Sequence, residues 1–245
     1  MNKKLLVVVE GPTGTGKTEI GIQLATHFNS EIISADSRQI FKELSIGTAK
    51  PTKEQRLKIT HHFVDFVSIH EMYNAFMFEE QVNAFLDSYF LSNDIAFMVG
   101  GSGMYINAVI NGIDLIPDID SEIRQSVSND SQLRGVKYLQ KELQQIDPEY
   151  YKIVDINNQA RLIRAIEVYK QTGKPYSSFR TKQLKQRSYQ VVKIAIDRER
   201  DDLYDRINLR VDEMVHEGLE AEAFKWNGYR YLNALQTVGY KEFFA

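Results

Sequence analysis

The sequence contains no cysteine among its 245 residues. This absence excludes disulfide bonds, thiolate nucleophiles and cysteine-based zinc sites. It also lacks an apolar run long enough to cross a membrane. The apolar run at residues 5–9 is too short for a signal peptide and leads directly into a glycine-rich loop, which favours a buried strand. We therefore expect a soluble, cytoplasmic protein without a membrane partner.

The net charge of −3 is unpromising for a nucleic-acid binder, but the charges are unevenly distributed. Residues 161–187 carry one acid, Glu167, and eight cations, which makes this stretch +7 and leaves −10 elsewhere. The eight cations are Arg161, Arg164, Lys170, Lys174, Arg180, Lys182, Lys185 and Arg187. Such asymmetry suggests a polyanion at one face, and interspersed aromatic rings suit stacking on unpaired bases. The alternative is an amphipathic helix followed by a charged linker, with the rings in the core.

Apolar runs alternate with segments of helical periodicity, which predicts an α/β fold with a parallel sheet flanked by helices. The predicted strands are residues 5–9, 31–34, 95–99 and 191–196. One predicted helix begins near Lys17, and three others cover residues 76–89, 200–216 and 219–226. Between 117 and 187 the strand-like runs disappear, and helices are expected at 132–145 and 158–172, the second ending at Gly173. The sequence thus predicts a core of residues 1–116 and 188–245, and a smaller all-helical insertion domain at 117–187.

Residues 11–18 read Gly-Pro-Thr-Gly-Thr-Gly-Lys-Thr and fit the P-loop pattern G-x-x-x-x-G-K-[ST]. They lie between a predicted strand and a predicted helix, the context that supports such a match over a coincidental glycine turn. Backbone N–H groups of such a loop converge on phosphate oxygens, and the helix N-terminus adds positive charge. Lys17 adds a full charge, and the Thr18 hydroxyl can bind Mg²⁺. The predicted diphosphate-binding residues are Gly11, Thr13, Gly14, Thr15, Gly16, Lys17 and Thr18.

Three further motifs leave alternatives open. Asp36 follows the second predicted strand, at the sheet edge where α/β proteins bind ligands, and would bind metal, take a proton or cap a helix. Ser102 lies in a glycine-rich segment at residues 99–105, which is either a ligand-binding turn or a plain strand-to-helix turn. Arg206 and Arg210 share a helix face that suits a diphosphate or is merely solvated. The adjacent pair at residues 61–62, two histidines, is interpreted as structural.

Together these motifs resemble one family, the tRNA dimethylallyltransferases, also called tRNA isopentenyltransferases. The similar segments are GPTGTGKT at 11–18, ISADSRQIFKELSIGTAKP at 33–51, HHFVDF at 61–66, VGGSGMY at 99–105, RLIRAIEVYKQTGKP at 161–175, LYDRINLRVDEM at 203–214 and VGYKE at 238–242. They occur in family order and cover nearly the whole chain, and the IGTAKP run at 46–51 is highly specific.

The resemblance implies transfer of a dimethylallyl group from dimethylallyl diphosphate to the N6 amine of the adenosine adjacent to the anticodon, releasing diphosphate. It implies a P-loop that holds the donor's diphosphate, Asp36 as general base, Ser102 as a catalytic hydroxyl, and Arg206 or Arg210 on the leaving group. The tRNA-binding residues it implies are Asp36, Ser37, Arg38, Gln39, Arg161, Arg164, Gln236, Gly239, Tyr240 and Lys241. The implied cofactor is Mg²⁺ bound at Thr18, and the implied partner is the anticodon stem-loop of tRNA, contacted by a monomer.

The sequence departs from the family at several points. Gly14 and Thr15 replace the usual pair of small residues, and Ser102 stands where threonine is usual. Family members continue beyond the VGYKE segment, so we interpret the chain as a shortened homologue or a truncated protein with weaker tRNA binding. Other functions remain open: a small-molecule kinase with 117–187 as its lid, a prenyltransferase acting on free adenine nucleotides, and a silent RNA-binding protein. The basic insertion favours RNA, and the intact Lys17 and Asp36 favour an enzyme.

Overall fold

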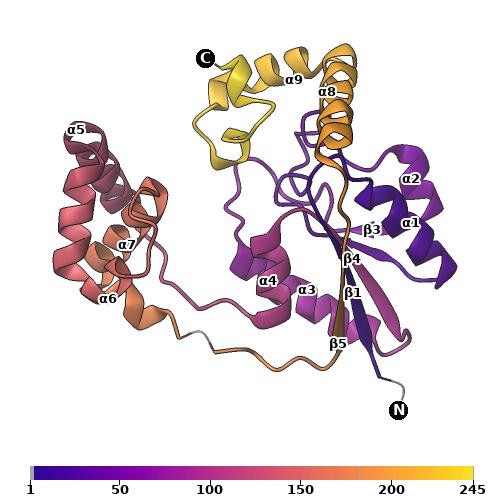
Figure 1. Cartoon of the computed structure of the whole chain (residues 1–245), viewed down its shortest axis with the longest axis horizontal. Helices are drawn as coiled ribbons and strands as arrows, with labels where there is room; N and C mark the ends of the chain where they lie inside the picture. Colours follow the sequence, from indigo (N-terminus) through magenta and orange to yellow (C-terminus); the bar gives the residue numbers. More distant parts are fainter. Residues whose placement is uncertain (1–2, 182, 245) are drawn as a thin grey trace. The chain divides into compact units, whose positions relative to one another are not determined.

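The computed structural model describes residues 3–181 and 183–244. The chain divides into two compact units (Figure 1). The first, called the core, comprises Met1–Gly112 and Lys185–Ala245, and the second, called the insertion, comprises Ile113–Leu184. The boundaries expected from the sequence, at 117 and 187, lie within four residues of these positions. Lys182, one of the eight cations counted above, falls outside the described residues.

The core contains a five-stranded sheet in which every paired neighbour is parallel. Its strands are β1 (Leu5–Glu10), β2 (Ile32–Ser34), β3 (His61–His62), β4 (Ile95–Gly100) and β5 (Gln190–Ala195), in the order β3-β2-β4-β1-β5. The predicted parallel α/β fold is therefore confirmed. Strand β3 was not predicted, because two histidines form no apolar run from which a strand is predicted.

Alternate residues of the central strand face opposite sides of the sheet. Val7 and Val9 pack in one apolar cluster with Ile22 of α1 (Lys17–His27). Leu6 and Val8 are fully buried and point to the other side, where α3 (Ala75–Tyr89) and α4 (Gly103–Asn111) lie (Figure 1). A strand that is buried on both faces reads as a continuous apolar run, and this explains why β1 was predicted within one residue.

Further helices and turns complete the core. They are α2 (Lys53–Lys58), α8 (Arg200–His216), α9 (Leu219–Trp226) and the 3₁₀ turns η2 (Asn227–Tyr229), η3 (Asn233–Leu235) and η4 (Lys241–Phe243). The short α2 is held by a capping box, in which Thr52 and Gln55 satisfy each other's backbone amides. None of the helices formed by residues 3–181 and 183–244 combines the length and the hydropathy that crossing a bilayer requires.

The two points at which the insertion interrupts the core chain are neighbours in the structure. The Lys185 amide donates to the Asn111 carbonyl at 2.9 Å. Nearby, the Glu79 carboxylate is buried and accepts hydrogen bonds from Lys185 Nζ and Arg187 Nη2, both at 2.8 Å. A buried carboxylate needs such partners to offset its desolvation. These contacts, all within the core, hold the two ends of the core chain together.

The insertion is all-helical, as predicted. It contains α5 (Ser121–Ile146), α6 (Pro148–Tyr151), α7 (Gln159–Thr172) and the 3₁₀ turn η1 (Tyr176–Phe179). Leu139 and Leu143 of α5 pack against Leu162 and Ile166 of α7 in a separate apolar core. Gly135 has a φ of 72° and breaks α5 into two helical parts. The N-terminal part was not predicted, because its sequence is largely polar and has weak helical periodicity.

Candidate active site at the phosphate-binding loop

The P-loop connects β1 to α1. Gly16 has a φ of 94° and forms the N-terminal boundary of α1 in the left-handed region. Gly11 is required for a different reason: a Cβ at this position would lie 2.3 Å from the carbonyl oxygen of Ile196. That contact is closer than any side chain tolerates. The glycines of the motif thus let the loop turn and pass close to the end of β5.

Lys17 is the first residue of α1, and its ammonium group donates a hydrogen bond to the Pro12 carbonyl within the loop. Burial and the nearby Arg210 lower the pKa of Lys17, whereas Asp36 acts in the opposite direction. These residues come from three separate sequence motifs. They also line one cavity, so the fold brings the three motifs together.

The two arginines of α8 both contact the P-loop. Arg206 Nε donates to the Gly14 carbonyl at 2.8 Å, and Arg210 Nη1 donates to the Thr13 hydroxyl at 3.2 Å. Burial lowers the pKa of Arg210, and Asp36 opposes that shift. The i and i+4 spacing therefore points a cationic face of α8 at the loop, and the alternative of a merely solvated face does not hold.

Asp36 stands just beyond the end of β2 and combines two of the roles considered above. Its Oδ1 accepts hydrogen bonds from the amides of Arg38 at 2.8 Å and Gln39 at 3.3 Å, so the carboxylate does cap the following turn. No hydrogen bond from residues 3–181 or 183–244 is found at Oδ2. The same side chain lines a cavity that it shares with the P-loop. Capping and chemistry therefore do not exclude each other at this position.

Ser102, between β4 and α4, holds the turn that follows Asp36. Its hydroxyl oxygen accepts a hydrogen bond from the Ser37 amide at 2.9 Å, and the hydroxyl pairs with Ser37 Oγ at 3.2 Å. Its own amide donates to the Ala35 carbonyl at 3.1 Å. Ser102 thus fixes the position of residues 35–37 relative to β4.

The motifs enclose one polar cavity of about 510 Å³. It is lined by P-loop residues together with Asp36, Ser102 and Arg210. A second cavity, of about 550 Å³, has mostly apolar walls and shares five lining residues with the first. The shared residues are Thr13, Asp36, Arg38, Arg210 and Thr237. A third, of about 360 Å³, lies beside Lys17 and Thr18 and is lined by both α8 arginines.

Several residues that the resemblance assigns to tRNA are engaged within the core. The Gln39 amide nitrogen donates to the carbonyls of Thr48 and Ala49 at 3.3 and 3.0 Å. The Gln236 amide nitrogen donates to the Arg230 carbonyl. Tyr240 is fully buried, which leaves no ring surface for a base. Their side chains therefore hold the local structure.

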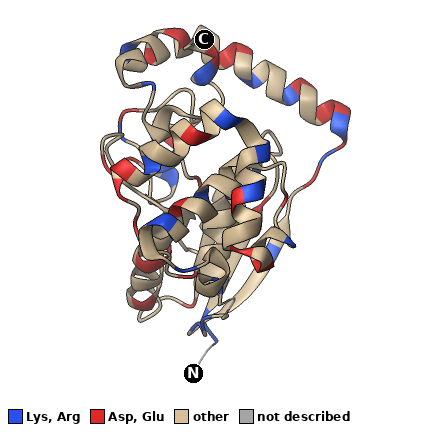
Figure 2. Cartoon of the chain, turned by 90° about the vertical axis from the view of Figure 1, so that its left-hand side faces the viewer, with Lys and Arg blue, Asp and Glu red and all other residues tan. Residues whose placement is uncertain are grey.

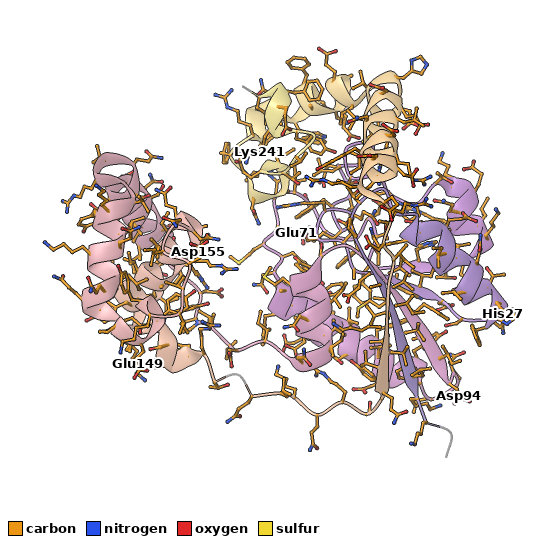
Figure 3. The ribbon with its side chains drawn as sticks, viewed as in Figure 1. His27, Glu71, Asp94, Glu149, Asp155 and Lys241 are labelled. Carbon is orange, nitrogen blue, oxygen red and sulfur yellow. The ribbon has the colours of Figure 1, made fainter. Side chains whose placement is uncertain are left out.

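The remaining residues of that set differ in exposure. Ser37, Arg38 and Gly239 are half-buried, and Lys241, labelled in Figure 3, is exposed. Arg38 Nη1 donates to the Asn233 carbonyl at 2.7 Å, which joins the Asp36 turn to the C-terminal segment.

The insertion carries both signs of charge (Figure 2). Arg161 is exposed on α7. Arg164 is half-buried, and its Nη1 lies 3.7 Å from Glu167 Oε2. Lys170 Nζ lies 3.4 Å from Asp130 Oδ2 of α5. Over residues 113–184 the sequence has eleven basic and ten acidic residues, a net charge of +1. The excess of +7 counted along residues 161–187 is thus largely offset by acids elsewhere in the same unit, among them Glu149 and Asp155 in Figure 3.

Three residues near the site were missed by the motifs. Arg198 Nε donates to the Thr15 carbonyl at 3.1 Å, Thr237 lines both large cavities, and Glu222 holds the 45–47 loop. Arg198 and Glu222 are single charged residues without a local pattern, so the sequence offered no signal for them. Thr237 directly precedes the similar segment at 238–242 and was not singled out.

The histidine pair forms β3 and has protein partners. His61 Nδ1 lies 3.0 Å from the Ile59 carbonyl, and His62 Nε2 lies 2.7 Å from Glu31. Burial is the main cause of the lowered pKa of His61. Over the described part of the chain, residues 3–181 and 183–244, no group of three or more His, Asp or Glu side chains is arranged to hold a metal ion.

Comparisons with known proteins agree on one family. The family model described as IPP transferase matches residues 39–245. A tRNA dimethylallyltransferase of Cytophaga hutchinsonii is 46% identical over 241 residues, which cover 98% of this chain and 79% of the relative.

Solved structures give the same result. The tRNA isopentenylpyrophosphate transferase of Bacillus halodurans matches with 37% identity and a TM-score of 0.66, over 99% of this chain and 76% of that chain. A eukaryotic dimethylallyltransferase acting on tRNA matches with 26% identity and a TM-score of 0.78, over 98% and 62% of the two chains.

Proposed function

The chain belongs to the tRNA dimethylallyltransferase family, and we propose that it transfers a dimethylallyl group from dimethylallyl diphosphate to N6 of the adenosine adjacent to the anticodon in tRNA. The observation that carries this proposal is the polar cavity in which the P-loop, Asp36 and Arg210 meet. A diphosphate site and a carboxylate for the acceptor amine are the two groups that such a transfer requires.

On the donor side, the P-loop amides and the N-terminus of α1 would hold the diphosphate. Negative charge develops on the diphosphate as the bond to the allylic carbon breaks, and Lys17 and Arg210 supply positive charge at that place. Between the two α8 arginines we assign the leaving group to Arg210. Arg210 lines the polar cavity together with Asp36 and Ser102, whereas Arg206 is not among the residues that line that cavity.

On the acceptor side, the N6 lone pair of adenine attacks the allylic carbon, and the carbon–oxygen bond to the diphosphate breaks with its electron pair leaving on oxygen. The amine must then lose a proton, and Asp36 is the carboxylate in the cavity that takes it. Because Oδ1 already accepts two backbone hydrogen bonds, Oδ2 is the oxygen assigned to N6. Ser102 fixes this arrangement through Ser37.

The apolar cavity suits the five-carbon group. Its walls include Val211, Met214, Leu219 and Phe243, and it shares Asp36 and Arg210 with the polar cavity. An allylic carbon that carries partial positive charge reacts with water, so walls that exclude water protect it. The change from polar to apolar lining also matches a donor with a charged end and a hydrocarbon end.

Reaching N6 requires the adenosine to leave its stack. Among the cations that resemble tRNA-binding positions, Arg161 of the insertion and Lys241 of the core are exposed, and Arg38 and Arg164 are half-buried. We assign them to the tRNA phosphates or bases. Gln39, Gln236 and Tyr240 are assigned a supporting role, because their polar groups are already bonded within the core.

The proposed cofactor is Mg²⁺. This ion prefers oxygen ligands and is commonly held by few protein groups together with substrate phosphates. The Thr18 hydroxyl lines the polar cavity next to Lys17, so it fits that donor set with the phosphate oxygens of the donor. When bound there, Mg²⁺ would neutralise charge on the leaving diphosphate.

The test is incubation of the protein with dimethylallyl diphosphate labelled in its allylic group, together with either tRNA or AMP. Label is expected in tRNA and not in AMP. A tRNA transcript with guanosine in place of the target adenosine is the matched control, because guanine presents an oxygen where adenine has N6. Label in AMP would instead support a prenyltransferase for free nucleotides, and equal labelling of both transcripts would contradict the proposed acceptor atom.

A further inference from the structure

Glu222 of α9 is the carboxylate with the most hydrogen bonds near the site, and the proposed reaction leaves it without a role. Its Oε2 accepts from the amides of Ser45 at 3.0 Å and Ile46 at 3.1 Å. Its Oε1 accepts from the amide of Gly47 at 3.1 Å and from the Tyr240 hydroxyl. A carboxylate offers about four lone-pair positions, so these four bonds use its full capacity.

Tyr240 is held tightly at the other end of this contact. Its side chain is fully buried, and burial together with the Glu222 carboxylate raises its pKa, so the phenol keeps its proton and remains a donor. A Cβ on Gly47 would lie 2.6 Å from the Tyr240 ring and 2.9 Å from Leu219 Cδ1. The ring therefore fills the space that glycine leaves open, and the two segments fit against each other in a single arrangement.

The segments joined by Glu222 form one wall of the apolar cavity. Gly47 and Thr48 line it, and so do Thr237, Val238 and Gly239. Glu222 and Tyr240 are not among the residues that line it, and they lie behind this wall. The wall adjoins Asp36 and Arg210, which line the same cavity.

A second contact ties this wall to the acceptor side. Gln39 bonds the carbonyls of Thr48 and Ala49, and its amide oxygen accepts from Ser34 Oγ at 3.0 Å. Asp36 Oδ1 in turn accepts a hydrogen bond from the backbone amide of Gln39. A displacement of residues 45–48 would therefore be passed to the turn that carries Asp36.

We propose that Glu222 is a positioning residue for prenyl transfer, which fixes residues 45–48 against Tyr240 and thereby sets the cavity wall beside Asp36. This inference rests on the proposed function. Glu222 acts through the residues it holds, and it touches neither the diphosphate site nor the apolar cavity. Misplacement of reacting groups by about 1 Å costs up to about 10²-fold in rate.

The main test replaces Glu222 by Gln. A glutamine oxygen accepts about two of the four hydrogen bonds, and its NH₂ group faces donors it cannot bond. We expect kcat for transfer to fall about 10- to 100-fold, while the affinity for inorganic diphosphate, which is assigned to the P-loop and not to the apolar cavity, stays within about twofold in calorimetry. Glu220→Gln is the matched control, because Glu220 is exposed on the same helix. Its kcat is expected to equal that of the wild type.

Tyr240→Phe serves as a second variant in case Glu222→Gln does not fold. It removes one donor and keeps the buried ring, so a smaller loss in kcat, about three- to tenfold, is expected. Hydrogen exchange is measured on both variants, because it does not depend on activity. Faster exchange at residues 45–48 with unchanged exchange at 11–18 is the expected result.

Unchanged exchange at 45–48 in a folded variant would overturn the inference. So would faster exchange with wild-type kcat, which would make the contact purely structural. A wild-type protein that transfers no label would overturn the proposed function and the role of Glu222 together. An active wild type matched by both variants would overturn the role of Glu222 alone.

Discussion

The P-loop and the turn that follows Asp36 line the same cavity but are built in opposite ways. The P-loop presents backbone groups shaped by glycines, and Lys17 extends across it. The Asp36 turn relies on side chains: Asp36 holds two amides, and Ser102 holds Ser37. In the P-loop, the backbone conformation at the glycines sets the shape of the loop. In the Asp36 turn, the atoms that hold the turn belong to the residue assigned to the chemistry.

The largest effect is expected on the P-loop side, from Lys17→Ala. Loss of this cation weakens binding of the donor's diphosphate and also removes charge that stabilises the departing diphosphate. We expect kcat/KM for dimethylallyl diphosphate to fall by more than about 10³-fold, with a melting temperature close to that of the wild type. Lys42→Ala, at an exposed position, is the control. Unchanged donor affinity in calorimetry would contradict the assignment of the P-loop to the diphosphate.

Asp36→Asn separates the two roles that the turn combines. Asn caps about as well as Asp, so the turn should persist, but Asn cannot take the N6 proton. We expect kcat to fall about 10²- to 10³-fold, within the range that a general base contributes, with donor affinity nearly unchanged. Asp36→Ala should in addition lose about 1 kcal/mol of unfolding free energy, measured by denaturant titration. A fall of less than about tenfold for Asp36→Asn would leave capping as the main role.

The α8 arginines test which side of the P-loop holds the leaving group. Arg210→Ala should lower kcat about 10²-fold, because Arg210 lines the cavity that also contains Asp36. Arg206→Ala should lower it less than about tenfold, since Arg206 lines a cavity that does not include Asp36. Single-turnover measurements with saturating donor give the two rates. The reverse order would move the diphosphate to the cavity beside Thr18.

The smallest effect is expected in the insertion, outside both loops. Arg161→Ala should weaken tRNA binding and reduce the slope of log affinity against log salt by about 1. Arg164→Ala should change the slope less, because Arg164 is half-buried and lies beside Glu167. Donor affinity should stay unchanged in both variants. A slope that both substitutions leave unaltered would show that the insertion contributes no phosphate contact through α7.

The comparison of the two loops also explains what could be predicted from the sequence. The glycine pattern of the P-loop follows from backbone geometry, so the motif and its flanking elements were predicted closely. At Asp36 the sequence could not separate a cap from a base, because the carboxylate both caps the turn and faces the cavity. Glu222 was missed because its four donors come from residues 45–47 and from Tyr240, which only folding brings together.

The net charge of the insertion was the property that the sequence window predicted least well. A count along residues 161–187 gives +7, but α7 packs against α5, which brings Asp130 and Glu142 close to Lys170. A linear window cannot include acids that lie 28 to 40 residues away and become neighbours in the fold. Individual exposed arginines such as Arg161 are therefore better guides to a tRNA contact than the sum.

The hydrogen bond between the Lys185 amide and the Asn111 carbonyl means that the core chain is closed where the insertion begins and ends. The hydrogen bond that joins these residues lies within the core, as does the ion pairing at Glu79 that accompanies it. The 72 residues of Ile113–Leu184 thus form an insertion between two core segments that are already hydrogen-bonded to each other. Each doubling of the length of an inserted loop raises the entropic cost of closing it by only about 0.6 kcal/mol. A change in the length of this part should therefore cost the core little free energy, and the scaffold of the diphosphate site should persist.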